Sequence, residues 1–266
     1  MREVAVNAQW QGGADMVTYY GAHELFDLYL TGQNVTLLPV SVEKSNALEK
    51  TNGILGFEIL HRQMQESFRN MSRSAPDKIV TLGGGCDADV PGIVYLSEKC
   101  HGDLTILWLD AHGDLNTPEE SSSSLFYGMP LRSLMDGSCF ALLENRFPLK
   151  AVQIIHIGGR EFDAAEERFI NTSGIRAYTV QDIRAGRISV ENLANPVYVH
   201  LDLDVLDPSD FPYTPLPVAN GLYSEEVFGI LEHFKDKLVG LGIYEYKPCH
   251  RKIPCIEKLI QFGLCI

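Results

Sequence analysis

Two short acidic runs in this chain have the residue types of a metal site. They are Asp110-Ala-His112-Gly-Asp114 and Asp202-Leu-Asp204. Side chains two positions apart on a strand point to the same side, so the groups within each run can converge. Converging carboxylates need a cation between them, and carboxylates with one imidazole suit manganese or a similar first-row metal. The runs therefore predict a site for one or two divalent cations, in preference to the alternative of capping and turn aspartates.

Each acidic run follows an unbroken apolar segment, residues 104–109 and 197–201. Such segments are typical of strands that are covered on both faces, as in a parallel sheet. Further segments with strand character are residues 3–8, 35–42, 78–82, 152–157, 176–180 and 238–244. Helical spacing occurs between several of them, at residues 54–69, 224–234 and 256–262. This alternation predicts a three-layer α/β/α protein with a mostly parallel sheet of about eight strands, and residues 1–266 as a single domain.

Polar and glycine-rich segments follow five of the predicted strands. Ligands of open α/β sheets bind at the carboxyl ends of the strands, so these segments should lie together. They are Gly83-Gly84-Gly85-Cys86, the two acidic runs, Gly158-Gly159-Arg160 and Glu245.

Composition excludes several classes of protein. The chain has 266 residues, 45% of them hydrophobic, and a formal net charge of −13, which argues against nucleic-acid binding. It contains no apolar stretch long enough to cross a membrane, and its start does not have the pattern of a signal peptide. The six cysteines form no CxxC pair or dense framework, which favours reduced thiols. We therefore expect a cytoplasmic protein without a membrane partner.

The order of the motifs resembles one family. A Gly-Gly turn after a strand, Asp-Ala-His-x-Asp-x-Asn, Asp-x-Asp-x-x-Asp-Pro and a strand-end Glu-x-x-Pro follow one another between Lys78 and Pro248, as in the ureohydrolases, which include arginase, agmatinase and formimidoylglutamase. The resemblance implies a binuclear manganese centre whose bridging hydroxide attacks an amidine or guanidine carbon. Five of the six metal-ligand positions of the family are matched by Asp110, His112, Asp114, Asp202 and Asp204.

The sixth ligand position differs, because Cys86 stands where the family turn has histidine. A thiolate suits zinc, cobalt, iron or nickel better than manganese, whereas a protonated thiol would leave one metal position weakened or empty. Asp87 and Asp89 follow closely and can lend an oxygen, but we favour the interpretation of a solvated turn or a helix N-cap near Pro91.

A second difference is Tyr127, in place of a histidine that the resemblance implies as a proton shuttle. Tyrosine, with an ordinary pKa near 10, exchanges protons more slowly at neutral pH.

Other positions match those that bind an amino-acid substrate in arginase-like relatives. The resemblance assigns the α-carboxylate to Asn116, Ser121 and Ser123, and the α-amino group to Asp163, although soluble loop serines and a helix-start acid are equally good interpretations. Glu245 matches the glutamate that pairs with the guanidinium group through two hydrogen bonds.

Two more residues allow two interpretations each. His200 has the strand parity of Asp202 and can support a metal ligand, but we favour a satisfied core histidine. Arg160 can bind an anion, and we favour an ion pair with the acids of its own loop.

The leading hypothesis is a metal-dependent amidinohydrolase that cleaves a linear C–N bond of a small guanidino or amidino compound. In it, Asp114 steers the nucleophile, Glu245 holds the substrate and Tyr127 relays protons. The alternative, suggested by Cys86 and Tyr127, is a non-catalytic ureohydrolase-like protein that binds a metal or a guanidino ligand, or acts as an oligomer subunit. The resemblance also suggests a homo-oligomer, a trimer or a hexamer.

Overall fold

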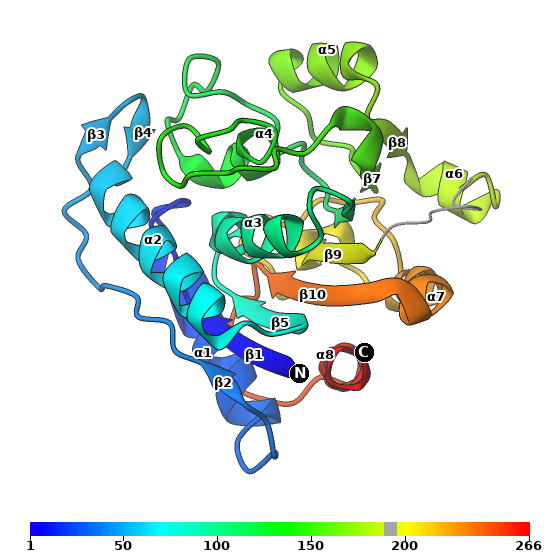
Figure 1. Cartoon of the computed structure of the whole chain (residues 1–266). Coiled ribbons are helices and arrows are strands. Elements are labelled where there is room, and N and C mark those ends of the chain that lie inside the picture. Colours follow the sequence, from blue (N-terminus) through cyan, green and yellow to red (C-terminus); the bar gives the residue numbers. More distant parts are fainter. Residues whose placement is uncertain (189–195) are drawn as a thin grey trace.

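Eight parallel strands form the central sheet of the computed structural model, which describes residues 1–188 and 196–266 (Figure 1). Their order across the sheet is β2-β1-β5-β10-β9-β6-β7-β8. The strands are β1 (Arg2–Asn7), β2 (Leu37–Leu38), β5 (Lys78–Gly83), β6 (Thr105–Leu109), β7 (Ile154–Ile157), β8 (Arg176–Tyr178), β9 (Val197–Asp202) and β10 (Leu238–Tyr244). The predicted number of strands and their parallel pairing are confirmed.

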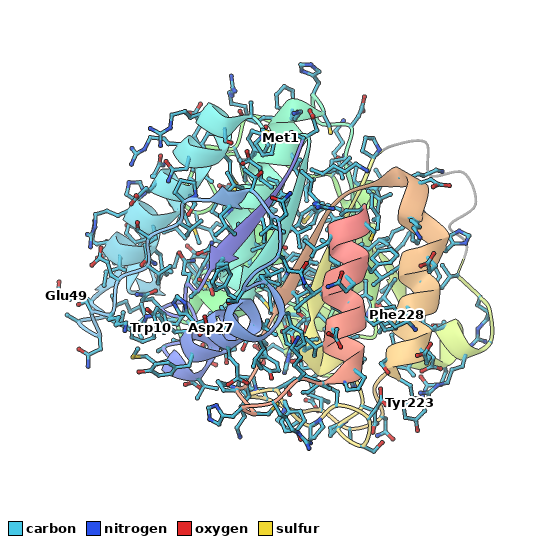
Figure 2. The ribbon with its side chains drawn as sticks, turned by 90° about the horizontal axis from the view of Figure 1, so that it is seen from below. Met1, Trp10, Asp27, Glu49, Tyr223 and Phe228 are labelled. Carbon is cyan, nitrogen blue, oxygen red and sulfur yellow. The ribbon has the colours of Figure 1, made fainter. Side chains whose placement is uncertain are left out.

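Helices cover both faces of the sheet. On one face lie α1 (Met16–Tyr29), α7 (Ser224–Phe234) and α8 (Pro254–Cys265), which stand in front of the sheet in Figure 2. On the other lie α2 (Phe57–Ser74) and α3 (Val90–Lys99), together with the short helix α4 (Pro130–Ser133). Alternate residues of one strand serve the two layers: Leu107 packs with the first group of helices, and Trp108 with the second. The predicted three-layer α/β/α architecture is confirmed.

Three predicted elements have different bounds in the structure. Of residues 35–42, only Leu37–Leu38 pairs with the sheet, since Pro39 has no N–H to donate. Residues 151–153 form a 3₁₀ turn, η3 (Ala151–Gln153), before β7 begins, and Val180 already belongs to helix α6 (Val180–Arg184) instead of the preceding strand. Helix α5 (Ala164–Ser173) and α6 lie beyond the β7–β8 end of the sheet (Figure 1).

The predicted helix over residues 54–69 begins later than expected. Residues Ile54–Leu55 form β4, which pairs antiparallel with β3 (Lys50–Thr51) in a small separate sheet. Gly56 follows with a φ of 72°, a left-handed conformation that glycine adopts without steric cost, and α2 starts at the next residue. The helical spacing therefore predicted the helix but not this turn.

The strand order brings the polar strand ends together. Five neighbouring strands, β5, β10, β9, β6 and β7, are the ones followed by the segments that the sequence marks for chemistry. Since all five run in the same direction, their carboxyl ends meet at a single edge of the sheet. Within the described residues, the helices lack the combination of length and apolar character that a bilayer span requires.

Candidate metal centre

One cleft, with a volume of about 320 Å³, lies at the carboxyl ends of these strands and collects nearly all of the predicted site residues. Only Asp110 is absent from the cleft wall, because it is completely buried beneath it. The predicted residues that line the cleft are Cys86, His112, Asp114, Asn116, Ser121, Ser123, Tyr127, Asp163, Asp202, Asp204 and Glu245. Residues at or beyond the carboxyl ends of five strands, β5, β6, β7, β9 and β10, are thus brought within reach of one small ligand.

The His112 ring lies between two buried carboxylates. Its Nδ1 atom is 2.8 Å from Asp204 Oδ2 and 3.6 Å from Asp110 Oδ1. Burial lowers the pKa of His112, but the hydrogen bonds and charges of Asp110 and Asp204 outweigh it and raise the pKa to about 12. Backbone groups hold the carboxylates in place, since the N–H of His112 donates to Asp110 at 2.7 Å and the N–H of Ala111 donates to Asp204 at 3.0 Å.

Cys86 occupies the other side of the acidic cluster. Its thiol donates to Asp202 Oδ2 at 3.0 Å, while Asp202 Oδ1 accepts the backbone N–H of Asp204 at 2.7 Å. Burial and the neighbouring carboxylates, Asp202 foremost, raise the pKa of Cys86 well above its ordinary value. Burial and the charge of Asp204 likewise raise the pKa of Asp202. Both shifts favour the protonated forms when no positive charge is added.

Two acids of the cleft, Asp114 and Glu245, have left-handed backbones, with φ of 55° and 58°. This conformation is unfavourable for residues with a Cβ and often occurs where a functional site fixes the direction of a side chain. Burial and nearby carboxylates raise the pKa of both groups well above the ordinary values. Asp114 Oδ2 is buried and has no hydrogen-bond partner among the described residues.

The donor atoms fit divalent cations. Ligand atoms of Asp110, His112 and Asp204 lie within 4.8 Å of one another, and so do those of Cys86, Asp202 and Glu245. Buried carboxylates with raised pKa values, one of them with an unpartnered oxygen, are the arrangement that a bound cation would stabilise.

The lining of the cleft also includes the residues predicted for an amino-acid substrate. The Asn116 amide donates to Asp163 Oδ2 at 2.9 Å, and the hydroxyls of Ser121 and Ser123 lie 3.4 Å apart. Asp163 is also the N-cap of α5, and its N–H donates to Glu166 at 2.8 Å. Asp163 therefore combines the position of a helix-start acid with access to the cleft.

Sequence reasoning missed Glu166, which is buried and lines the cleft. Its carboxylate accepts the backbone N–H groups of Leu115 and Asp163, at 2.9 and 2.8 Å, and so ties the first acidic run to α5. The spacing Asp163-x-x-Glu166 is that of a capping box, a signal that could have found it.

Tyr127 lies in a 3₁₀ turn, η2 (Phe126–Gly128), on the wall of the cleft. Its backbone N–H donates to the carbonyl of Gly12 at 3.1 Å, which fixes the turn against the loop after β1. Burial raises the pKa of the Tyr127 phenol, so the hydroxyl is protonated at neutral pH.

The interpretation of Asp87 and Asp89 as a solvated turn is wrong, and of the expected N-cap only the position is found, with Asp89 preceding α3. Both are buried, in the 3₁₀ turn η1 (Cys86–Asp89) that passes beneath the cleft. Asp87 accepts from the side-chain amide of Gln9, and Asp89, although it precedes α3, makes no capping hydrogen bond. A short turn packed between β5 and α3 leaves these side chains no path to solvent.

Two other interpretations also need correction. Arg160 makes no ion pair within the described residues, because its guanidinium donates to four backbone carbonyls, those of Gly158, Asp204, Val218 and Ala219. His200 is buried as expected, but it is not a satisfied core histidine, since its Nε2 atom has no hydrogen-bond partner among the residues described.

Comparison with known proteins agrees with this site. A model of the arginase family matches residues 27–252, and the chain belongs to this family. An arginase of Staphylococcus aureus (strain MRSA252) is 32% identical over 229 residues, which cover 81% of this chain and 75% of that protein.

Solved structures share the fold. An Entamoeba histolytica arginase in complex with L-ornithine has a TM-score of 0.85 at 20% identity, with 100% of this chain and 98% of that chain covered. Proclavaminate amidino hydrolase from Streptomyces clavuligerus has a TM-score of 0.71 at 22% identity, with coverages of 99% and 89%.

Proposed function

We propose that the protein is a metal-dependent hydrolase that cleaves a linear C–N bond in a small guanidino or amidino compound. The observation that carries this proposal is the cluster of four buried aspartates, Asp110, Asp114, Asp202 and Asp204, with the half-buried His112 and with Glu245, at the floor of the cleft. Membership of the arginase family supports the same reaction class.

One or two divalent cations would be held by Asp110, His112, Asp114, Asp202, Asp204 and Cys86. A bound cation of this kind lowers the pKa of a water ligand and so supplies a nucleophile at neutral pH. The protein groups then have distinct tasks: Asp114 accepts a hydrogen bond from the nucleophile and steers it, and Glu245 meets the guanidinium or amidinium group. Tyr127, whose hydroxyl keeps its proton, donates toward the leaving amine.

We further propose that the substrate has an amino-acid end. Asn116, Ser121 and Ser123 line the cleft on the wall that Asp163 also lines, and they offer amide and hydroxyl groups to a carboxylate. Asp163 and Glu166 give that wall negative charge suited to an ammonium group. The E. histolytica arginase structure contains L-ornithine, an amino acid, and this supports the same class of ligand here.

The second candidate is a protein of the same fold that binds a metal or a guanidino ligand without turnover. It is favoured by one observation, the hydrogen bond that the protonated thiol of Cys86 donates to Asp202. Location in the cytoplasm and assembly into a homo-oligomer stay predictions under either candidate.

Metal loading followed by a turnover assay tests the proposal. Metal-free protein is loaded separately with manganese, zinc, cobalt and nickel, the bound ions are counted, and release of urea or ammonia from a panel of guanidino and amidino compounds is measured. Turnover that depends on a bound metal supports the enzyme. Failure to bind any of the four metals would exclude it, and bound metal without turnover would favour the second candidate.

A further inference from the structure

A buried histidine outside the predicted ligand set has the environment of a metal ligand. His200 Nδ1 lies 2.8 Å from Asp89 Oδ2, and both side chains are inaccessible to solvent. The carboxylate can only accept, so Nδ1 carries the proton and donates it. In the neutral imidazole with this tautomer, the other ring nitrogen, Nε2, has a free lone pair, and it is buried without a partner among the described residues.

The ring of His200 is also fixed in orientation. It stacks on Trp108 with the ring centroids 3.5 Å apart and on Tyr244 with centroids 4.6 Å apart, and the interplanar angles are 4° and 9°. These residues belong to β6, β9 and β10, which are neighbours in the sheet. Two stacked neighbours and the hydrogen bond to Asp89 together leave the imidazole little freedom to turn.

Glycine makes room for this arrangement. A Cβ atom on Gly242 would lie 2.3 Å from the Tyr244 ring, and one on Gly83 would lie 2.0 Å from it. Asp89 is held in turn by the hydroxyl of Tyr198, which donates to its other oxygen. The sequence therefore provides both the space and the carboxylate that hold His200 in place.

His200 belongs to a third group of possible metal ligands. Ligand atoms of Cys86, Asp110, Asp114 and His200 all lie within 4.8 Å of one another, and all four side chains are buried. In tetrahedral zinc sites, a thiolate sulfur and a carboxylate oxygen are about 3.5 Å apart, given bonds of about 2.3 and 2.0 Å. Cys86 Sγ and Asp110 Oδ2 are 4.0 Å apart, so a contraction of about half an ångström would close the group around one ion.

We propose that His200 is a metal ligand, and that with Cys86, Asp110 and Asp114 it forms a site for zinc or cobalt. This inference rests on the proposed metal centre and changes its composition. A carboxylate that orients one ring nitrogen while the other binds the ion is the usual support of metal-binding histidines, and Asp89 has that position. The imidazole that the resemblance leads one to expect at position 86 is thereby supplied by β9.

The donor set determines the preferred metal. One thiolate, one imidazole and two carboxylates are softer than an all-oxygen site with a single imidazole, and they favour zinc or cobalt over manganese. Asp110 also belongs to the group with His112 and Asp204, so it can bridge this ion and a second one.

The replacement H200N separates the ligand from its support. The asparagine amide can keep the hydrogen bond to Asp89 but has no atom at the place of Nε2. Y244F is the matched control, because it alters the same buried layer and keeps the ring that stacks on His200. Metal-free forms of both variants and of the wild type are titrated with cobalt, and bound ions and visible absorption are recorded.

We expect two cobalt ions per chain in the wild type and in Y244F. In H200N, one of the two sites should bind cobalt at least about 100-fold more weakly. This loss exceeds the one expected for a residue that only supports a ligand, which typically costs about 10- to 100-fold in metal affinity. The absorption band of the cobalt–thiolate pair should weaken with that site.

Two unchanged sites in H200N would overturn the assignment of His200 and leave the proposed function intact. No bound metal in the wild type would overturn both. If H200N does not fold, ¹⁵N spectra of histidine-labelled wild-type protein decide the matter. Zinc should then shift the ring nitrogens of two histidines, and a shift confined to His112 would refute the proposal.

Discussion

The sulfur of Cys86 lies 3.0 Å from Asp202 Oδ2, and burial raises the pKa of that carboxyl well above its ordinary value. Cys86 is therefore a hydrogen-bond donor to one ligand of the centre, and it must lose its proton before the sulfur can bind a metal. A cation that forms a strong bond to sulfur offsets the free-energy cost of removing the thiol proton. Manganese prefers oxygen ligands and offsets less of that cost.

The replacement C86H should raise manganese occupancy. An imidazole can offer a lone pair without giving up a proton at neutral pH, so manganese no longer competes with a buried thiol proton. Equilibrium dialysis followed by metal analysis measures the ions bound per chain. The control C139A changes another buried cysteine outside the cleft and should bind as the wild type does. Equal manganese stoichiometry in C86H and wild type would show that Cys86 is not the weakened ligand.

Much of this site was predictable from sequence because its residues stand at the ends of strands, and the sheet fixes where those ends lie. Asp110 and Asp202 each follow an apolar strand, and parallel strands end at the same edge, so their meeting required no knowledge of loops. The network around Asp89 was not predictable in this way. It depends on how a four-residue turn packs beneath a neighbouring strand, and a carboxylate in such a turn usually faces solvent.

The same distinction explains the boundaries of the elements. The helix over residues 224–234 was predicted correctly because its amphipathic pattern is uninterrupted. Residues 35–42 are apolar enough for a strand, but an edge strand requires only a few ladder bonds, and Pro39 interrupts them. The ion pair expected for Arg160 rested on its charged neighbours in the sequence, whereas two of the four backbone carbonyls that it binds, those of Val218 and Ala219, come from a distant loop.

Removal of the Glu245 charge should weaken substrate recognition more than metal binding. In E245Q, a paired hydrogen bond to a cationic substrate is lost, which typically costs about 1.5–3 kcal/mol, or roughly 10- to 150-fold in kcat/KM. Steady-state kinetics with the best guanidino compound measures the effect. The control E161Q alters an exposed acid on the same cleft and should change kcat/KM by less than about threefold. Similar losses in both variants would contradict a specific role for Glu245.

The buried Asp87 should make the metal-free protein less stable as the pH rises. Burial raises the pKa of Asp87 to about 7, against an ordinary value of 3.8. Between these two values the folded state holds a proton that the unfolded state has released, so the free energy of unfolding falls with increasing pH, by up to about 1.4 kcal/mol per unit.

The variant D87N lacks this ionisation. Its stability relative to the wild type should grow by roughly 2 kcal/mol between about pH 5 and pH 8. Urea denaturation of the metal-free proteins at both pH values measures the difference, with D236N as a control on the exposed surface. A stability difference that does not change with pH would refute the assignment.

Tyr127 should limit the rate of proton transfer to the leaving amine. Its phenol is protonated at neutral pH because burial raises its pKa, so it can donate a proton but recovers one from solvent slowly. In Y127H, an imidazole with a pKa closer to neutrality should exchange protons faster, and kcat should rise about tenfold or more if this step limits turnover.

In Y127F, where no proton can be donated, kcat should fall by about 100-fold. The dependence of kcat on pH provides the second measurement: Y127H should acquire an inflection near pH 6 to 7, about the ordinary pKa of histidine, in addition to any inflection that it shares with the wild type and Y127F. If Y127F turns over as fast as the wild type, proton donation by Tyr127 is excluded, and water must protonate the leaving group.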